Sequence, residues 1–314
     1  MSESKETNFI DVEEISNFFD NEFRTKETPL DPSMSRFLPM VYDSIGFDWK
    51  NFFEPEFLVS FNGLMIRGLK PILKVICVVF FDDEVVEKIL QDPTEGILVF
   101  CHHPIQMECG DPQGEMGKGF LPVNPELLKR LKDKNISVYA CHAPLDAGSI
   151  SGLGTNESIV NVLNAKVVSQ YYPYGHGFAA RVCELPNTMR VSELTQIFKN
   201  ILNLPYVDLQ GVKERDVKKL VVLAGGGGSY SDIKGAEDIG VDCVITGEVT
   251  SKIIGERGDK ERLALDEFYK NTGISAIGLS HAGSEYLVMP EIASWIESTL
   301  KIKAVSLPEI RWWR

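Results

Sequence analysis

The chain has 314 residues, a formal net charge of −13 and a sequence pI near 5.0, and this length is enough for about two domains of ordinary size. Its acidic surface would repel a phosphate backbone, so we expect no binding of duplex nucleic acid. The longest apolar run, Ile72 to Phe81, contains a lysine and is much shorter than the roughly 18 residues of a membrane-spanning helix, so we expect no membrane partner.

The predicted elements begin with an N-terminal helix and an irregular segment. Residues 12–23 carry four apolar side chains at helical spacing, which is typical of an amphipathic helix. The next stretch is polar and contains Pro29 and Pro32, which interrupt regular structure. We therefore interpret residues 1–56 as a helix followed by an irregular insertion, residues 26–56, packed on the surface.

From residue 57 onward, strand-like and helix-like runs alternate, which is typical of α/β proteins. The predicted strands are 73–80, 96–100, 136–140, 166–171, 219–223, 243–245, 274–279 and 304–307. The predicted helices are 83–90, 125–134, 157–163, 192–200, 231–238, 260–272 and 292–301. Because no linker rich in Gly, Pro or Ser divides the chain, we expect two interleaved α/β units. The first unit has residues 57–165 and 274–314, and the second has residues 166–273.

Two segments of the chain resemble each other and predict a duplicated unit. KNISVYACHAPLD (134–146) and TGISAIGLSHAGSE (272–285) each contain a predicted strand, then a histidine, then an acid four residues later. Upstream of them, GILVFCHHP (96–104) and VDCVITGEV (241–249) both end in polar residues. Because ligands bind at the carboxyl ends of strands in α/β sheets, we expect all four strand ends to face one cleft between the units. Chance convergence of buried strand sequences is the alternative.

Four of the five histidines directly follow predicted strands. They are His102, His103, His142 and His281. Adjacent side chains of a strand point to opposite faces, but at a strand end, before Pro104, two imidazoles can serve one site. The acids Asp146 and Glu285 can ligate a metal or orient the histidine four residues before each of them. Singly, each pair also fits a core histidine beside a helix N-terminal acid. Three such elements in one chain favour a metal site.

Several motifs, in this order, closely resemble the Nif-three-like dinuclear-metal family, whose bacterial members are often labelled type-two homologues of GTP cyclohydrolase one. The motifs are SFNGLMIRG (60–68), CHHP (101–104), YACHAPLD (139–146), LGTNESI (153–159), YPYGHGFAARVCEL (172–185), LAGGGGSYSDI (223–233), ITGE (245–248) and GLSHAGSE (278–285). The resemblance runs from about Phe57 to the C-terminus. It implies that the metal ligands are His102, His103, Asp146, His281 and Glu285, with His142 beside the metals as a catalytic proton carrier.

The resemblance also implies a homo-oligomer, because the family forms ring-shaped hexamers whose cavity faces the metal sites. Three features depart from the family pattern. Residues 26–56 are longer than the usual N-terminus, and Ser280 stands where a glycine is common. After Glu248, where many relatives carry further histidine or basic residues, the run is Val249 to Lys252.

The predicted donor set indicates a reactive metal site. Three imidazoles and two carboxylates do not saturate two metal ions, so water must complete their coordination, and open positions are typical of reactive sites. Mixed nitrogen and oxygen donors favour two divalent transition-metal ions per chain (Zn, Fe, Mn, Co or Ni) and exclude an all-oxygen calcium site. The local positive charge would select a small anionic or phosphorylated ligand.

We therefore expect a dinuclear-metal hydrolase that acts on a phosphorylated small molecule or nucleotide, either GTP cyclohydrolase-like or a phosphohydrolase. The alternative is a non-catalytic metal-binding scaffold or partner-binding adaptor, because a fold and a site do not specify a reaction.

Other features of the sequence carry weaker signals. Six cysteines without C-x-x-C spacing and an acidic N-terminus unlike a signal peptide predict a cytoplasmic protein. We interpret Cys101 and Cys141 as buried core residues and His176 as a flexible loop histidine. The loop Gly225–Gly228, between a predicted strand and helix, either cradles a phosphate or allows a close approach of the backbone. The sequence leaves both interpretations open.

Overall fold

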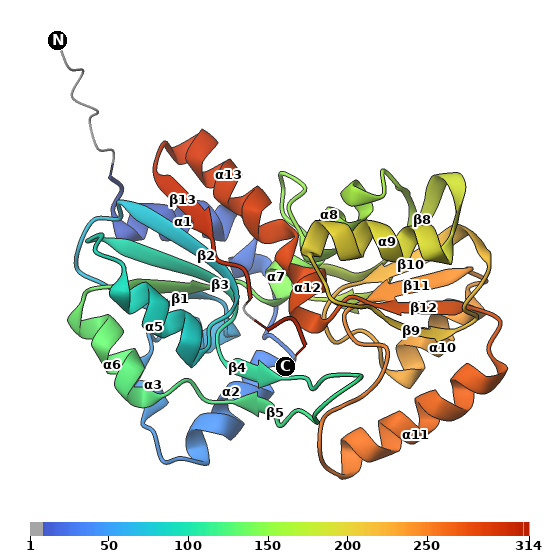
Figure 1. Cartoon of the computed structure of the whole chain (residues 1–314). Helices are drawn as coiled ribbons and strands as arrows, with labels where there is room; N and C mark the ends of the chain where they lie inside the picture. Colours follow the sequence, from blue (N-terminus) through green and yellow to red (C-terminus); the bar gives the residue numbers. More distant parts are fainter. Residues whose placement is uncertain (1–8, 310, 314) are drawn as a thin grey trace.

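The computed structural model describes residues 9–309 and 311–313, and within them it has a mixed α/β fold with two large sheets and one small one (Figure 1). The five-stranded sheet has the order β1-β6-β3-β2-β13, and only β1 is antiparallel to its neighbour. Its strands are β1 (Gly63–Ile66), β2 (Lys74–Phe80), β3 (Ile97–His103), β6 (Ser137–Ala140) and β13 (Lys303–Ser306).

The six-stranded sheet has the order β7-β8-β10-β11-β12-β9 and lies between β6 and β13 in the chain. Its strands are β7 (Lys166–Tyr174), β8 (Gly177–Arg190), β9 (Asp208–Gly211), β10 (Asp216–Leu223), β11 (Cys243–Thr246) and β12 (Ser275–Gly278). The small sheet pairs β4 (Gln106–Glu108) with β5 (Gly119–Leu121). The chain therefore leaves the first sheet after β6 and returns to it at β13.

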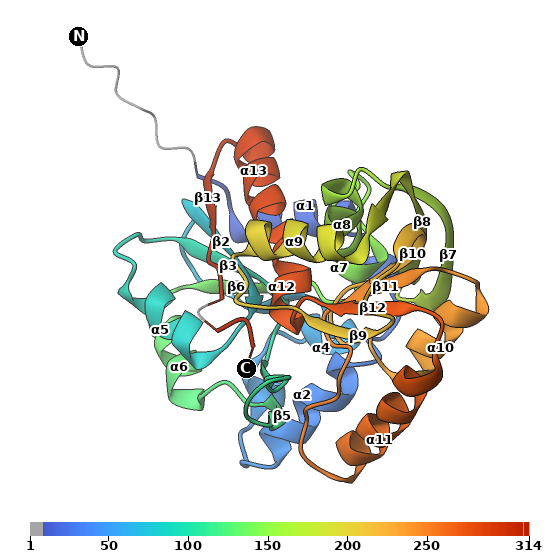
Figure 2. The same ribbon diagram turned by 45° about the vertical axis from the view of Figure 1, so that its right-hand side comes forward.

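Helices flank both sheets, and α7 and α12 lie between the two sheets (Figures 1 and 2). The 3₁₀-helix η1 (Thr25–Glu27) and α2 connect α1 to the rest of the first unit. The α-helices are α1 (Val12–Glu22), α2 (Met34–Asp43), α3 (Trp49–Phe52), α4 (Phe57–Ser60), α5 (Asp83–Gln91), α6 (Pro125–Asp133), α7 (Ala143–Ala147), α8 (Thr155–Val162), α9 (Val191–Leu202), α10 (Tyr230–Asp238), α11 (Glu256–Asn271), α12 (His281–Tyr286) and α13 (Val288–Leu300).

The two large sheets share a four-strand arrangement. In the first sheet, β2, β3 and β6 are parallel neighbours, and β1 runs antiparallel beside β6. In the second sheet, β10, β11 and β12 are parallel neighbours, and β9 runs antiparallel beside β12. The two similar sequence segments contain β6 and β12, which correspond in these arrangements. The shared strand order therefore supports duplication over chance convergence.

The strand that carries the adjacent histidines is longer than the predicted 96–100, because β3 continues to His103. Pairing of β3 with β6 ends at Cys101, whereas pairing with β2 continues to His103. The last two residues thus have a partner strand on one side only. This loss of one neighbour at the strand end lets both imidazoles approach the same carboxylate, as described below.

The prediction of an irregular surface insertion at residues 26–56 is wrong. This segment contains α2 and α3, and Met34, Leu38 and Tyr42 of α2 are fully buried in a core beneath the first sheet. The apolar spacing is helical, but Pro39 inside α2 obscures the pattern in the sequence. α2 also packs against β5, as Figures 1 and 2 show.

Two further expectations need correction. We expect a strand at 274–279 in the first unit, but this strand, β12, belongs to the second sheet. There it pairs with β11 and β9, so the second unit extends past residue 273. The long strand β8 was not predicted, because Pro186 and the polar residues near its end argue against a strand. The acidic N-terminus that we interpreted as unlike a signal peptide falls largely in residues 1–8, outside the described residues.

The core lies on both faces of each large sheet. Along β2, Ile76 and Val78 face one apolar cluster, while Val75 and Val79 face another. Such two-sided burial gives the continuous apolar runs typical of parallel strands, and it explains why these strands were predictable. In the described part of the chain, no helix has the length and apolar character needed to cross a membrane. All six cysteines are buried and free, as expected for Cys101 and Cys141.

Candidate metal centre

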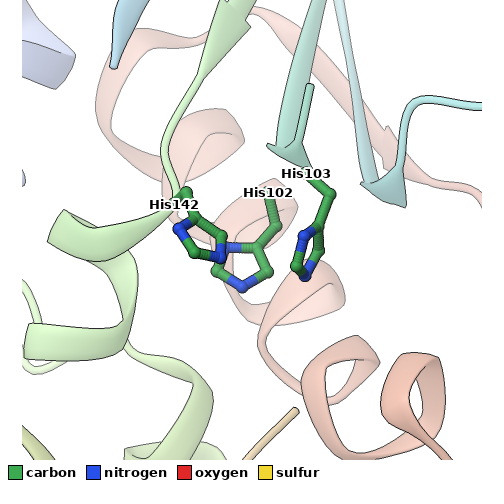
Figure 3. Close-up of side chains that lie close together, drawn as sticks. All are labelled: His102, His103 and His142. Carbon is green, nitrogen blue, oxygen red and sulfur yellow. The ribbon is translucent and has the colours of Figure 1, made fainter. Parts of the chain in front are cut away.

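The ends of the parallel strands in both sheets bring the six predicted site residues together. His102 and His103 end β3. His142 caps the N-terminus of α7, shortly after β6, and Asp146 lies within this short helix. His281 and Glu285 lie on α12, which follows β12. Figure 3 shows the three imidazoles of the first unit gathered at the end of β3.

A cavity of about 640 Å³ opens over this cluster. The residues that follow the four corresponding strands all line it: His103, His142, Glu248 and His281. The prediction that these four strand ends face one cleft is therefore confirmed. His102 lies deeper and is fully buried.

Glu285 is the centre of the cluster. Its Oε2 lies 3.0 Å from Nε2 of His103. Its Oε1 lies 3.4 Å from Nε2 of His102 and 3.3 Å from Nε2 of His281. One buried carboxylate thus touches three imidazoles that come from both halves of the chain.

Asp146 contacts the same cluster from the other side, with Oδ1 3.5 Å from Nε2 of His102. Thr155 donates a hydrogen bond to this oxygen at 2.8 Å. The guanidinium of Arg181, which is 1% exposed, donates to the backbone carbonyls of Asp146 and Ala147 and pairs with Glu157 at 2.6 Å. The LGTNESI motif and the AARV stretch therefore hold Asp146 in place. The sequence offered no role for Arg181.

Three of the four clustered histidines have Nδ1 engaged by an oxygen outside the cluster. Nδ1 of His102 lies 2.9 Å from the carbonyl of Cys141. Nδ1 of His142 lies 2.9 Å from Asp31, and Nδ1 of His281 lies 2.5 Å from Glu248. Such contacts place the proton on Nδ1 and leave Nε2 free to ligate a metal.

Sequence reasoning did not find Asp31 at all, and it placed Glu248 at the cleft without recognising it as the partner of His281. Glu248 ends the ITGE motif, and its position after a strand was a usable signal. Asp31 precedes α2, where an aspartate is a typical helix cap, but nothing in the sequence connects it to a histidine 111 residues away.

The residues fit a metal site, because two buried imidazole nitrogens have no well-formed hydrogen bond among the described residues, and one of them, on His102, has only the long carboxylate contacts given above. They are Nε2 of His102 and Nδ1 of His103. A buried polar atom without a partner costs about 1–3 kcal/mol, and a metal ion would satisfy it. Four groups of three His, Cys, Asp or Glu side chains have ligand atoms within 4.8 Å of one another. This arrangement could hold more than one ion.

The charges of the cluster depend on burial and mutual contact. Burial alone would lower the pKa of His102, but the carboxylates of Glu285 and Asp146 overcome it and raise the pKa to about 9. Burial, with the neighbouring His102, lowers the pKa of His103 well below its usual value. Burial would raise the pKa of Glu285, but His281, His103 and His102 hold it well below the ordinary range. Without metal, the ionised carboxylate of Glu285 thus lies between a protonated His102 and a neutral His103.

The glycine loop packs directly against the cluster. A Cβ on Gly225, whose φ is +71°, would lie 2.1 Å from Oε1 of Glu285, and one on Gly228 would lie 1.3 Å from the carbonyl of Glu248. The N–H of Gly225 donates to the hydroxyl of Ser284. These contacts support the interpretation that the glycines allow a close approach, rather than that they cradle a phosphate.

Two further side chains lie near the cluster. His176 is not an isolated loop histidine, because it connects Thr28 with the carbonyl of Gly148 at 2.8 and 3.2 Å. Cys109 lies within 4.8 Å of Glu248 and His281. Burial and the charge of Glu248 raise the pKa of this thiol to about 12, so it is a protonated thiol in the metal-free chain.

Comparisons with known proteins agree with this architecture. A family model described as Duf34/NIF3 (NGG1p interacting factor 3) matches residues 58–310. Curated relatives include a "GTP cyclohydrolase 1 type 2 homolog" of Clostridium acetobutylicum, 24% identical over 242 residues, which are 74% of this chain and 78% of the relative. The homolog of the same description from Archaeoglobus fulgidus is 27% identical over 255 residues, 79% of this chain and 89% of the relative.

Solved structures show the same fold. TTHA1606 from Thermus thermophilus has a TM-score of 0.64 at 18% identity, over 96% of this chain and 99% of its own. Reduced HcgD from Methanocaldococcus jannaschii has a TM-score of 0.63 at 20% identity, over 96% of this chain and 99% of its own.

Proposed function

We propose that this chain, which belongs to the Duf34/NIF3 family, binds two divalent transition-metal ions at its histidine–carboxylate cluster and hydrolyses a phosphorylated small molecule or nucleotide there. The observation that carries the proposal is the pair of unpartnered imidazole nitrogens, on His102 and His103, at the floor of an open cavity. The ligands that we propose are His102, His103, Asp146, His281 and Glu285. Bound divalent ions would lower the pKa of water and polarise a substrate oxygen.

The cavity walls support an anionic substrate that carries a ring. Arg36, Lys118 and Arg257 line the cavity. Lys118 pairs with Glu108 at 3.4 Å, whereas no carboxylate in the described part of the chain lies within ion-pair distance of Arg36 or Arg257. The guanidinium of Arg36 lies over the ring of Phe37, with Cζ 4.8 Å from its centroid. Neither guanidinium is neutralised by a carboxylate, so both can pair with a phosphate, whose geometry guanidinium matches well.

Aromatic side chains line the same cavity. Phe37 of α2 stacks on Phe120 of β5, with ring centroids 4.1 Å apart, and both line the cavity. Tyr172 and Tyr174 line it from the end of β7. A planar base can stack on such side chains, so we favour a nucleotide among phosphorylated substrates.

We propose that His142 moves a proton during the reaction. Its Nδ1 is held by Asp31, so Nε2 is the nitrogen that can accept a proton in the cavity. Positioned groups of this kind contribute about 10²–10⁴-fold to a rate.

The test is turnover of a panel of nucleotides and small phosphate esters by protein loaded in turn with Zn, Fe, Mn, Co and Ni. We expect metal-dependent hydrolysis of at least one compound, and we expect His142→Ala to retain metal while it lowers the rate about 10²–10⁴-fold. His176→Ala is the matched control, because His176 lies outside the cluster. Loss of all metal in His142→Ala would instead make His142 a ligand.

The depth of the cluster supports a second candidate, a non-catalytic metal-binding scaffold or partner-binding adaptor. His102, His103 and Glu285 are 0%, 2% and 3% exposed, as is common for structural metal sites. Full metal loading without turnover of any compound in the panel would favour this candidate.

We also propose that the chain forms a homo-oligomer, a hexamer on family resemblance. The exposed edge strand β7 supports an interface, because among the described residues it pairs with β8 alone and it exposes Val167, Val168 and Tyr172. Such edges invite pairing with another chain. Light scattering of the metal-loaded protein tests this proposal, and a monomer would contradict it.

A further inference from the structure

We propose that Asp31 is a positioning residue for His142: it holds the ring with its proton on Nδ1 and directs Nε2 toward the histidine–carboxylate cluster. This inference deepens the proposed function, and only its kinetic consequence rests on that function. The tautomer of the ring is a property of the chain itself.

Asp31 comes from the N-terminal segment, between η1 and α2, outside the matched residues 58–310. Its side chain is fully buried. Burying a carboxylate costs free energy unless hydrogen bonds satisfy its oxygens. Both side-chain oxygens of Asp31 accept such bonds.

Both oxygens of Asp31 accept hydrogen bonds from groups that can only donate. Oδ1 accepts from the backbone N–H groups of Ser33 and Met34, at 3.0 and 2.8 Å, and so caps α2. Oδ2 accepts from the N–H of Ala143 at 3.0 Å and the amide of Asn62 at 3.3 Å. These four donors stabilise negative charge on both oxygens, so they favour the ionised form of the carboxyl group.

The ring of His142 must then donate to this carboxylate. Its Nδ1 lies 2.9 Å from Oδ2 of Asp31, and an ionised carboxylate can only accept. The hydroxyl of Tyr174 lies 3.4 Å from the same nitrogen, beyond the usual range of a strong hydrogen bond. The proton therefore lies on Nδ1.

Nε2 is the nitrogen left to face the cluster. The ring of His142 stacks on that of His102, with centroids 4.9 Å apart, and meets that of His103 edge-on at 4.8 Å. Figure 3 shows the three rings converging. Each ring has one nitrogen that lies within 4.8 Å of a nitrogen of both other rings. An unprotonated Nε2 here can bind metal or accept a proton.

Asparagine at position 31 would disturb this arrangement in either orientation. An amide has one acceptor oxygen and one donor nitrogen, so its NH₂ group must face either the N–H groups of α2 or those of His142 and Ala143. An NH₂ group that faces α2 would leave two backbone N–H groups without an acceptor, those of Ser33 and Met34, whereas one that faces the ring leaves only the N–H of Ala143. We therefore expect the NH₂ to face the ring, and the proton of His142 then moves to Nε2. The equivalent change in the Ser–His–Asp triad of serine proteases gives the wrong tautomer and lowers kcat about 10⁴-fold.

The experiment is ¹⁵N NMR of zinc-loaded protein labelled on the histidine rings, with the His142 signal identified by its absence in His142→Gln. We expect wild-type His142 to carry its proton on Nδ1 and none on Nε2, and Asp31→Asn to lose this preference. Asp242→Asn is the matched control, because Asp242 also accepts from two backbone N–H groups and a guanidinium, in the second sheet.

A proton on Nε2 of wild-type His142 would overturn the proposal, as would an unchanged His142 signal in Asp31→Asn. The wild-type spectrum decides the tautomer even where Asp31→Asn fails to fold. Where the metal-loaded wild type turns over a substrate, Asp31→Asn should lower kcat about 10²–10⁴-fold with little change in KM. Absence of wild-type turnover would count against the proposed function and leave the tautomer test standing.

Discussion

His142 and His281 follow corresponding strands of the two sheets, yet their carboxylate partners come from different places. His281 contacts Glu248, which follows the neighbouring strand β11. The corresponding strand of the first sheet, β3, ends instead in His102 and His103. The first half of the duplication thus uses its strand end for two histidines, and the carboxylate for His142 comes from Asp31 in the N-terminal segment.

This difference shows how a duplicated fold becomes an asymmetric site. Each half contributes a histidine and an acid four residues later, and these lie at matching strand ends. The carboxylates that contact Nδ1 of His142 and of His281 differ. The neighbouring strand end supplies a glutamate in the second half, whereas in the first half it supplies two histidines and no carboxylate. The predictions below test which contacts both halves share and which belong to one half.

The largest effect is expected where the two halves meet. His102→Ala and Glu285→Gln should lower bound metal toward one ion or none per chain, because Glu285 touches imidazoles from both halves. The loss of affinity should exceed the 10–100-fold typical of residues that only orient ligands. Elemental analysis measures the stoichiometry, with His176→Ala as the control. Wild-type stoichiometry in both variants would refute the ligand assignment.

A smaller effect on metal affinity is expected from a change confined to the second half of the duplication. Glu248→Gln should weaken metal binding about 10–100-fold, because the amide no longer fixes the proton on Nδ1 of His281. Competition with a chelator measures the affinity. Glu267→Gln, on the exposed surface of α11, is the control. Equal affinities in Glu248→Gln and the wild type would show that His281 needs no carboxylate partner.

The pH dependence of metal affinity should reflect His102, in the first half of the duplication. In the metal-free chain the pKa of His102 is raised to about 9, so its protonated ring stabilises the fold below pH 6.5, and this contribution is lost as pH rises toward 9. Metal must displace that proton. Metal affinity should therefore rise between pH 7 and pH 9, by about tenfold per unit for each proton displaced. A histidine with the reference pKa of about 6.5 would instead lose its proton before pH 7 and give little change in affinity above it.

Affinity measured at several pH values by chelator competition, corrected for protonation of the chelator, tests this dependence. A flat profile from pH 7 to pH 9 would mean that His102 is neutral before metal binds, and it would contradict the proposed charge network.

The smallest effect is expected at the glycine loop. Gly225→Ala should destabilise the fold by about 1–3 kcal/mol through overpacking against Glu285. Gly235→Ala, inside α10 with open space around it, should stabilise by about 0.5–1 kcal/mol. Chemical denaturation measures both. Equal stability of the Gly225→Ala variant and the wild type would show that Glu285 moves freely, against the close approach described here.

The parts of the fold that could be predicted from the sequence are those with local signals. The parallel strands are buried on both faces and appear as apolar runs, and the site residues follow them in repeated patterns. The helix α2 was hidden because Pro29 and Pro32 precede it and Pro39 interrupts its apolar spacing. β8 was hidden by Pro186. These failures come from local breakers that tertiary packing overrides.

The supporting contacts of the site could not be predicted, because they join residues far apart in the chain. Asp31 and His142 are 111 residues apart, and Arg181 reaches the backbone of Asp146 from β8. Composition and periodicity carry no information about such pairs. Only the folded chain shows that an apparent insertion contributes a carboxylate to the cluster.

The most direct test of the central claim is the metal content of the purified wild-type chain, measured by elemental analysis after exposure to Zn, Fe, Mn, Co and Ni and removal of free ions. The account predicts about two divalent ions per chain, and fewer in His102→Ala and Glu285→Gln. A wild-type chain that retains none of these metals would contradict it.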